Sequence, residues 1–232
     1  MSLPFYVSPE QLMQDKAEYA RKGIGRGKSS LTLEYDGGIL LMAENPSRLS
    51  KIGEIYDRIA FAGVGKFSEF DQLRKVGVRY ADVKGYAYSR DDVRGKALAN
   101  AYSQAMGDVF TRELKPLEVE VIVAEVGDDG LSGQEKNAIF RVQFDGSISV
   151  HEGYCVIGGT ADDLASFLGN EYRAGMPLGD AVQMGRRALQ RANEGGPGVE
   201  PRNLEVCVLD RSRAGRKFQR LPTDMVKQYL GA

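Results

Sequence analysis

The chain has 232 residues, a formal net charge of -1 and 27% charged residues. This near-neutral balance excludes the large basic surface that marks most proteins of nucleic acids and anionic membranes. No apolar run approaches the roughly 20 residues that span a bilayer, and the N-terminus lacks the pattern of a signal peptide. We therefore expect a cytoplasmic protein of one large domain, without a nucleic-acid or membrane partner.

The first predicted element is a helix over residues 8–22. Ser8 is a good N-cap, Pro9 suits the first helical position, and Gln11 would complete a capping box. Gly23 follows, and we expect it to end the helix in the left-handed conformation. The strands begin only after this helix, so a lone helix precedes the β-rich part of the chain.

The rest of the first half consists of hairpins followed by helices. Residues 29–35 alternate apolar and polar side chains, a turn follows, and residues 39–44 form a strand buried on both faces. Two more short strands are predicted within residues 49–65. The predicted helices are 67–77, ended by Gly77, and 91–114.

The second half repeats this plan. Two strands pair across a polar loop, a third strand and two helices follow, and a hairpin and a short helix close the chain. These elements are expected at residues 117–127, 138–148, 153–159, 161–175, 177–196, 203–212, 216–222 and 223–230. Strands grouped in hairpins and helices grouped in pairs predict an α+β fold with two antiparallel sheets face to face and helices on both outer faces.

No catalytic or metal-binding set stands out. The stretch GIGRGKSS resembles a phosphate loop, but it is one residue too short between Gly23 and Gly27, and it follows a helix instead of opening one. The single histidine, His151, has no recognisable nucleophile as a partner. Cys155 and Cys207 lie in apolar runs that favour buried thiols. We predict no metal and no cofactor, which favours an assembly or binding component over an enzyme.

Three stretches together resemble the α subunits of the 20S proteasome, specifically the actinobacterial type. They are SPEQLMQDKAEYARKGIGRGKSSLTLEYDGGILLMAENPSR, KIGEIYDRIAFAGVGKFSEFDQLRKVGVRYADVKGYAYSRDDV and ELKPLEVEVIVAEVG. The resemblance implies a four-layer αββα sandwich, the fold of N-terminal nucleophile hydrolases, with an extra N-terminal helix. It divides the single domain 1–232 into a gate tail (1–7), the N-terminal helix (8–22), the sandwich (about 28–222) and a C-terminal helix and tail (223–232).

β-type subunits of this family use a processed N-terminal threonine as nucleophile and base, with an acid and a lysine nearby. By resemblance, Glu44 stands at the acid's position and Lys51 at the lysine's, while Lys28 occupies the threonine's place inside the chain. Attack by the threonine needs the free α-amine as its base. We therefore predict that the chain has no catalytic residue of its own, and that the active sites of a threonine-type endopeptidase complex lie on its β partners.

The resemblance also implies a structural role. Family α subunits form heptameric rings that cap the β rings, and ring-shaped ATPase activators insert their C-terminal tails into pockets between α neighbours to admit tagged protein substrates. The pocket lysine that pairs with the tail carboxylate matches Lys51, and a pocket glycine after the first helix matches Gly23. A third pocket position, often leucine in archaeal relatives, is Lys66 here.

The residues that would close the pore form a short apolar segment, Leu3, Pro4, Phe5, Tyr6 and Val7. Burial of their apolar area would hold the gate shut. The next subunit of the ring would be contacted through the first helix, at Ser8, Pro9, Leu12 and Met13.

Two other functions stay open at this point. One is a self-compartmentalising N-terminal nucleophile hydrolase with its own activity, which would require an autocleavage that exposes a nucleophile such as Ser29. The other is a soluble binding domain that never assembles.

Overall fold

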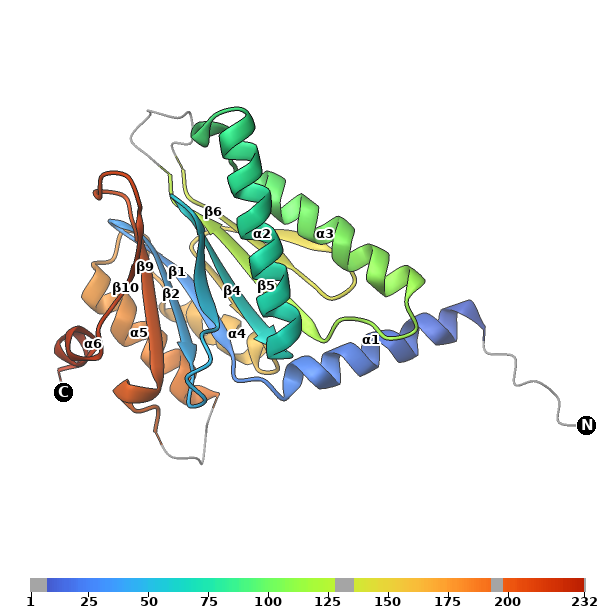
Figure 1. The fold of residues 1–232 in the computed structure, drawn as a ribbon. Helices are drawn as coiled ribbons and strands as arrows, with labels where there is room; N and C mark the ends of the chain where they lie inside the picture. Colours follow the sequence, from blue (N-terminus) through green and yellow to red (C-terminus); the bar gives the residue numbers. More distant parts are fainter. Residues whose placement is uncertain (1–7, 128–135, 193–197, 232) are drawn as a thin grey trace, which may run out of the picture.

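The computed structural model describes residues 8–127, 136–192 and 198–231, and these fold into four layers (Figure 1). Two five-stranded antiparallel sheets lie face to face, and helices cover the outer face of each. The α+β sandwich predicted from the sequence is therefore confirmed, including the helix that precedes the first strand.

The first sheet has the strand order β10-β9-β2-β1-β8. β2 lies in its middle, paired with β1 and β9, which explains why almost all of its residues are buried. β1 and β2 form the predicted hairpin, and β9 and β10 form the predicted terminal hairpin. The strands are β1 (Ser30–Tyr35), β2 (Gly38–Glu44), β8 (Tyr154–Ile157), β9 (Leu204–Asp210) and β10 (Phe218–Arg220).

The second sheet has the order β3-β4-β5-β6-β7, with every neighbouring pair antiparallel. β5 and β6 pair as expected, and most of the polar loop between them falls on residues 128–135, outside the described part. The strands are β3 (Ile52–Tyr56), β4 (Ile59–Gly65), β5 (Val119–Glu125), β6 (Ala138–Val142) and β7 (Ile148–His151).

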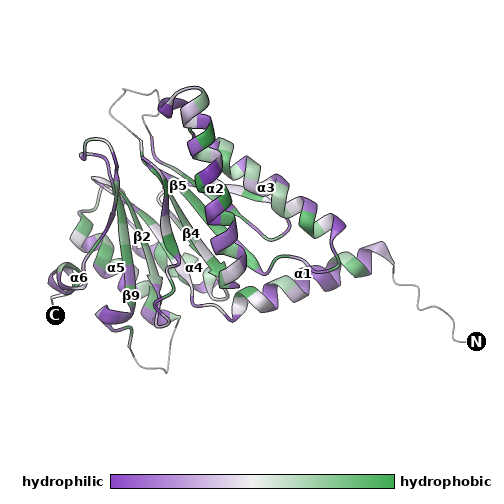
Figure 2. Ribbon diagram, viewed as in Figure 1, coloured by the Kyte–Doolittle hydropathy of each residue, from purple (hydrophilic) through white to green (hydrophobic). Residues whose placement is uncertain are grey.

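The helices form the two outer layers. α2 and α3 pack on the second sheet, whereas α4 and α5 pack on the first, with α6 beside α5. In Figure 2 the hydrophobic colour is concentrated on the strands, and hydrophobic and hydrophilic residues alternate along the helices. The helices are α2 (Phe67–Ala87), α3 (Gly95–Arg112), α4 (Ala161–Glu171), α5 (Leu178–Arg191) and α6 (Thr223–Leu230), with single 3-10 turns η1 (Arg90–Asp92) and η2 (Pro201–Asn203).

Three apolar layers separate these four layers of backbone. The central one lies between the sheets and contains Leu41, Ile122 and both cysteines. Cys155 and Cys207 are unpaired and buried, as predicted, and burial raises the pKa of each thiol to about 12. Neither thiol is therefore available as a thiolate nucleophile near neutral pH.

The first helix, α1 (Pro9–Gly25), closes one end of the space between the sheets. Ala20 and Ile24 from its C-terminal half belong to the central apolar layer. Further back, the Lys16 ammonium donates to the carbonyl of Phe110 in α3, at 3.1 Å. The N-terminal half of α1 extends beyond the sandwich (Figure 1).

The start of α1 agrees with the sequence in part. Ser8 caps it, because its hydroxyl accepts the Gln11 backbone N–H at 3.2 Å. The reciprocal half of the predicted capping box is absent, since the Gln11 side chain donates to Asp15 at 2.7 Å instead of returning to Ser8.

The predicted end of this helix is wrong. Gly23 lies inside α1, which continues to Gly25, so the helix covers residues 9–25 and not 8–22. Burial of Ile24 between the sheets holds the extra turn, and the backbone N–H groups of Arg26 and Gly27 close it on preceding carbonyls.

A second predicted stop, Gly77, also lies inside its helix, because α2 runs on to Ala87. A Cβ atom at Gly77 would come 1.8 Å from the hydroxyl oxygen of Tyr102 in α3. The glycine thus permits close packing of two helices. Tertiary contact explains it better than local backbone preference does.

Candidate functional site

Lys51 lies at the junction between the β2–β3 loop and β3, and both its backbone N–H and its carbonyl are hydrogen-bonded. Its N–H donates to the Glu205 carboxylate at 2.9 Å, and its carbonyl accepts the N–H of Gly63 in β4 at 3.0 Å. The side chain is partly buried, and its ammonium donates to the carbonyl of Lys28 at 2.7 Å. An ammonium has three donors, so a carbonyl contact of this kind leaves it able to receive a further acceptor.

Burial lowers the pKa of Lys51 to about 8, against the opposing effect of two carboxylates, Glu205 first and Glu44 second. The nearby Lys28 ammonium adds to the lowering. Near pH 7 the side chain therefore stays mostly cationic, in surroundings where an incoming anion would meet less water than at an open surface.

Glu205 is a buried residue of β9, and the structure surrounds its carboxylate with donors. Besides the Lys51 N–H, it accepts the N–H of Ile52 at 3.2 Å and the Asn45 side-chain amide at 2.7 Å. The Arg220 guanidinium also donates to it, and donates with its other arm to the Ile52 carbonyl at 2.8 Å. A strand of the first sheet thereby fixes the start of the edge strand of the second.

The three residues matched to the catalytic positions of β-type relatives do come together. The Lys28 ammonium lies 3.3 Å from Glu44, and Lys51 reaches the Lys28 carbonyl. Lys28 nevertheless sits in unbroken chain between α1 and β1, so no α-amine is available there. The positions matched by resemblance to the acid and the lysine hold Glu44 and Lys51, and the position matched to the nucleophile holds a lysine inside the chain.

Gly23 and Lys66 lie at a neighbouring cluster of charges, around Glu118 and Glu69. A Cβ at Gly23 would meet the side chain of Glu118 at 2.2 Å. Lys66 pairs with Glu69 at 3.2 Å, and its backbone N–H donates to the Glu118 carbonyl at 2.9 Å. β4 links this cluster to Lys51, because Gly63 and Lys66 lie three residues apart.

Lys115 completes this charged cluster, which we call the Glu69–Glu118 cluster. Its ammonium lies 3.0 Å from Glu69 and 2.8 Å from Glu118. Burial alone would raise the pKa of Glu69. The hydrogen bond from the Glu118 backbone N–H and the two lysine side chains have the larger, opposite effect, so the pKa of Glu69 is below its usual range. Lys66 therefore already has an acidic partner on its own chain.

Sequence reasoning missed Gly27, which the structure places beside the Lys51 site. A Cβ there would come 3.0 Å from a methyl of Val64 and 3.2 Å from the backbone nitrogen of Gly65. Gly27 directly precedes Lys28, whose carbonyl holds the Lys51 ammonium. The close approach of two backbone segments is the signal, and it is visible only in three dimensions.

The predicted gate residues, 3–7, lie outside the described part of the chain. Of the predicted ring-contact residues, Ser8, Pro9 and Leu12 are exposed on the half of α1 that extends beyond the sandwich, and Met13 is partly buried. Tyr19 on the same helix is also exposed. An exposed apolar face of this kind is typical of an interaction surface.

A second exposed apolar surface lies along α2. It consists of Val76, Tyr80, Val83 and the two tyrosines at the end of the helix, of which Tyr86 is 95% exposed. Large apolar side chains grouped on one helix are unusual on the surface of a monomer. Both surfaces are what a subunit of a larger assembly would present.

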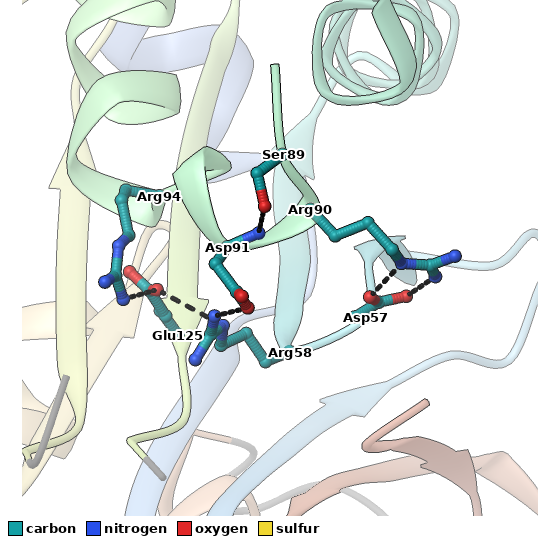
Figure 3. Close-up of polar contacts among 7 residues, drawn as sticks. All are labelled: Asp57, Arg58, Ser89, Arg90, Asp91, Arg94 and Glu125. Atoms are coloured by element: carbon teal, nitrogen blue, oxygen red, sulfur yellow. Dashed lines mark hydrogen bonds and ion pairs between the residues drawn. The ribbon is translucent and has the colours of Figure 1, made fainter. Parts of the chain in front are cut away.

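A separate buried charge cluster, the Glu125 cluster, lies where α2 connects to α3 (Figure 3). Glu125 lies at the end of β5. Its carboxylate is 3.8 Å from a guanidinium nitrogen of Arg58 and 3.6 Å from one of Arg94, and it accepts the Gly95 N–H at 2.8 Å. Arg58 also reaches Asp91 at 3.3 Å. Burial raises the pKa of Glu125 above its usual range despite these cations.

The described ranges, 8–127, 136–192 and 198–231, contain no group of three or more His, Cys, Asp or Glu side chains placed to hold a metal ion. They also contain no helix that is long and apolar enough to cross a bilayer.

Comparison with known proteins identifies the family. A family model described as proteasome subunit matches residues 24–209. A "Proteasome subunit alpha" of Thermomonospora curvata is 52% identical over 99% of this chain and 98% of its own length. Proteins of the same name from Xylanimonas cellulosilytica and Acidimicrobium ferrooxidans are 51% and 49% identical, over 95% and 100% of this chain and 93% and 97% of their own lengths.

The sandwich, the extra N-terminal helix and these matches define a proteasome subunit. The chain belongs to the α subunits of the 20S proteasome core, of the actinobacterial type.

Proposed function

We propose that this chain is the non-catalytic ring subunit of a bacterial 20S proteasome. Copies of it would form a heptameric α ring that scaffolds the β subunits, controls the entry of tagged protein substrates and docks a ring-shaped ATPase activator in the cytoplasm. The observation that carries the non-catalytic part is the continuous backbone from α1 into β1 through Lys28. Without a free α-amine, a threonine-type nucleophile has no base.

The rival enzyme hypothesis would need cleavage before a residue such as Ser29. Ser29 is buried, and its hydroxyl lies 2.7 Å from that of Thr160. A hydroxyl enclosed in this way offers no approach for a protein substrate, which favours the non-catalytic subunit.

Activator docking is supported by Lys51. Its partly buried ammonium, charged near pH 7, would pair with the terminal carboxylate of an activator tail. The pocket would extend along β4 toward Lys66 and Gly23, and the neighbouring subunit would supply its other wall. The segment 3–7 would form the gate.

Native mass spectrometry tests the assembly, with the chain alone and with its β partner. We expect rings or stacked rings in the presence of β, and intact α chains throughout. A monomer in both conditions would make the chain a non-assembling binding domain, and a cleaved α chain with hydrolytic activity would favour the enzyme.

The gate is tested by deleting residues 2–7 and measuring peptide hydrolysis by the assembled particle. We expect faster hydrolysis because the pore is no longer blocked. Unchanged hydrolysis would refute the assignment of residues 3–7 to the gate.

A further inference from the structure

Glu205 is the residue that connects Lys51 to the rest of the fold. It lies 154 positions away in the sequence, on β9 of the first sheet, yet it accepts the backbone N–H groups of both Lys51 and Ile52. Arg220 on β10 holds the carboxylate from the other side and also binds the Ile52 carbonyl. The backbone position of Lys51 therefore depends on the terminal hairpin.

We propose that Glu205 is a positioning residue of the activator site. Its carboxylate fixes the main chain of Lys51, and its negative charge favours the charged form of the Lys51 side chain, which would bind an anionic tail. This inference rests on the proposed function of Lys51. It adds a residue from a distant part of the sequence that never touches the tail itself.

The charges around Lys51 support this role. Burial opposes its positive charge, and Lys28 adds to that effect. Two carboxylates act in the other direction, and Glu205 has the larger effect while Glu44 is shared with Lys28. The Arg220 guanidinium pairs with the Glu205 carboxylate and partly neutralises its charge. Since the pKa of Lys51 is already lowered to about 8, loss of Glu205 would bring it into the physiological range.

The geometry separates this role from simple stabilisation. Many buried carboxylates paired with arginine stabilise a fold without serving a site. Glu205 differs because two of its acceptor contacts are with the lysine that would bind the tail and with the residue after it. Its removal changes both where Lys51 lies and how readily it loses its proton.

The chain offers a matched control in Glu120 on β5. Glu120 is buried like Glu205, binds an arginine (Arg141, 2.7 Å) and accepts a backbone N–H (Gly158, 3.2 Å). The charges that act on the pKa of Lys51 are Glu205, Glu44 and Lys28, and Glu120 is not one of them. Glu120→Gln should therefore reproduce any general loss of stability without the effect on the site.

The experiment uses assembled α–β particles carrying wild-type α, Glu205→Gln or Glu120→Gln. The probe is a fluorescent octapeptide with the C-terminal sequence of the ATPase encoded in the same genome, made with a free carboxylate and, separately, as the C-terminal amide. Anisotropy gives the affinity between pH 6 and 9. Competitive labelling with trace acetic anhydride, followed by peptide mapping, gives the titration midpoint of Lys51 without any tail.

We expect Glu205→Gln to lower the Lys51 midpoint by about one pH unit, since loss of a nearby opposite charge shifts a pKa by 1–3 units. At pH 7.5 that shift alone weakens binding of the carboxylate peptide about threefold, and the misplaced main chain weakens it further. Glu120→Gln should match wild type in both measurements. Glu205→Asp, which keeps the charge but shortens the reach, should weaken binding at every pH with little change in the midpoint.

A wild-type midpoint and wild-type affinity in Glu205→Gln would overturn the inference, as would wild-type affinity in Glu205→Asp. The proposed function fails in a different way: Lys51→Ala would then bind the carboxylate peptide as tightly as wild type does. In that case the labelling midpoint still decides whether Glu205 controls Lys51.

Discussion

Two buried glutamates in this subunit are built alike and lie in different surroundings. Glu205 and Glu125 each sit at one end of a strand, bind arginine and accept the first N–H groups of another element, β3 in one case and α3 in the other. Glu125 faces two arginines near the junction of α2 and α3 (Figure 3). Glu205 has one arginine and, beside it, the partly buried Lys51.

The comparison shows that a buried ion pair alone does not mark a functional site. In the Glu125 cluster the carboxylate faces two arginines and accepts the first N–H of α3, which holds a connection in place. Glu205 and Arg220 also hold a connection, the start of β3. Beside them, however, lies the Lys51 ammonium, whose pKa is lowered by burial. We therefore infer a function from the residue beside the ion pair, Lys51, and not from the pair itself, and the following predictions test that inference.

The largest effect is expected for stability at the Glu125 cluster. Glu125→Ala leaves two arginines facing a buried cavity, and removal of one partner of a buried pair costs about 3–5 kcal/mol. Urea denaturation of the purified subunit should show this loss in the free energy of unfolding. A loss below about 1 kcal/mol would mean that the cluster is solvated and contributes as little as a surface pair does.

The next effect concerns binding at Lys51. Lys51→Ala removes a charge-assisted hydrogen bond of about 1.5–3 kcal/mol, so the affinity of the assembled particle for the carboxylate peptide should fall about 10- to 100-fold. Arg94→Ala is the control, since it removes a partly buried cation from the Glu125 cluster. Equal losses of affinity in the two variants would contradict the distinction between the clusters.

A smaller effect is expected from pH. The pKa of Lys51 is lowered to about 8, and the proposed activator tail would bind the protonated form. Affinity should therefore be full below about pH 7, fall by half near pH 8 and fall about tenfold for each unit above that. An affinity that stays constant to pH 9.5, measured with the same peptide and corrected for its own titration, would show that the Lys51 charge is not used.

The smallest effects are expected at Gly23 and Lys66. Gly23→Ala pushes the Glu118 side chain aside, and Lys66→Ala removes a pair with Glu69 in which the lysine is about half exposed. Exposed pairs are worth about 0–1 kcal/mol, so tail affinity should fall by no more than about fivefold. Gly27→Ala should have the larger effect, because its Cβ would meet backbone next to the Lys51 site. If Gly23→Ala weakens tail binding more than Gly27→Ala does, the centre of the pocket lies at Gly23.

Much of the fold could be predicted from the sequence because its signals are local. Period-two alternation and turn residues located the hairpins, and the apolar run of β2 indicated a central strand. The two wrong helix ends, Gly23 and Gly77, have a common cause. Each glycine permits a close side-chain approach inside a helix, by Glu118 and by Tyr102, and a stop signal looks the same in sequence.

The site was predicted less completely. Resemblance pointed to Lys51, and the structure shows a partly buried lysine whose ammonium donates to the Lys28 carbonyl and whose pKa is lowered by burial. Glu205 could not be predicted, because its partners lie on another sheet and a glutamate near the start of a strand usually reads as a solvated residue. Gly27 was hidden for the same reason, since only the folded chain brings it against β4.

The most direct test is a structure of the assembled α–β particle with the carboxylate octapeptide bound, determined by electron cryomicroscopy. We expect the terminal carboxylate to lie about 2.7–2.9 Å from the Lys51 ammonium, with Glu205 still bound to the Lys51 and Ile52 backbone. A peptide carboxylate held by other residues, with Lys51 facing away, would contradict it.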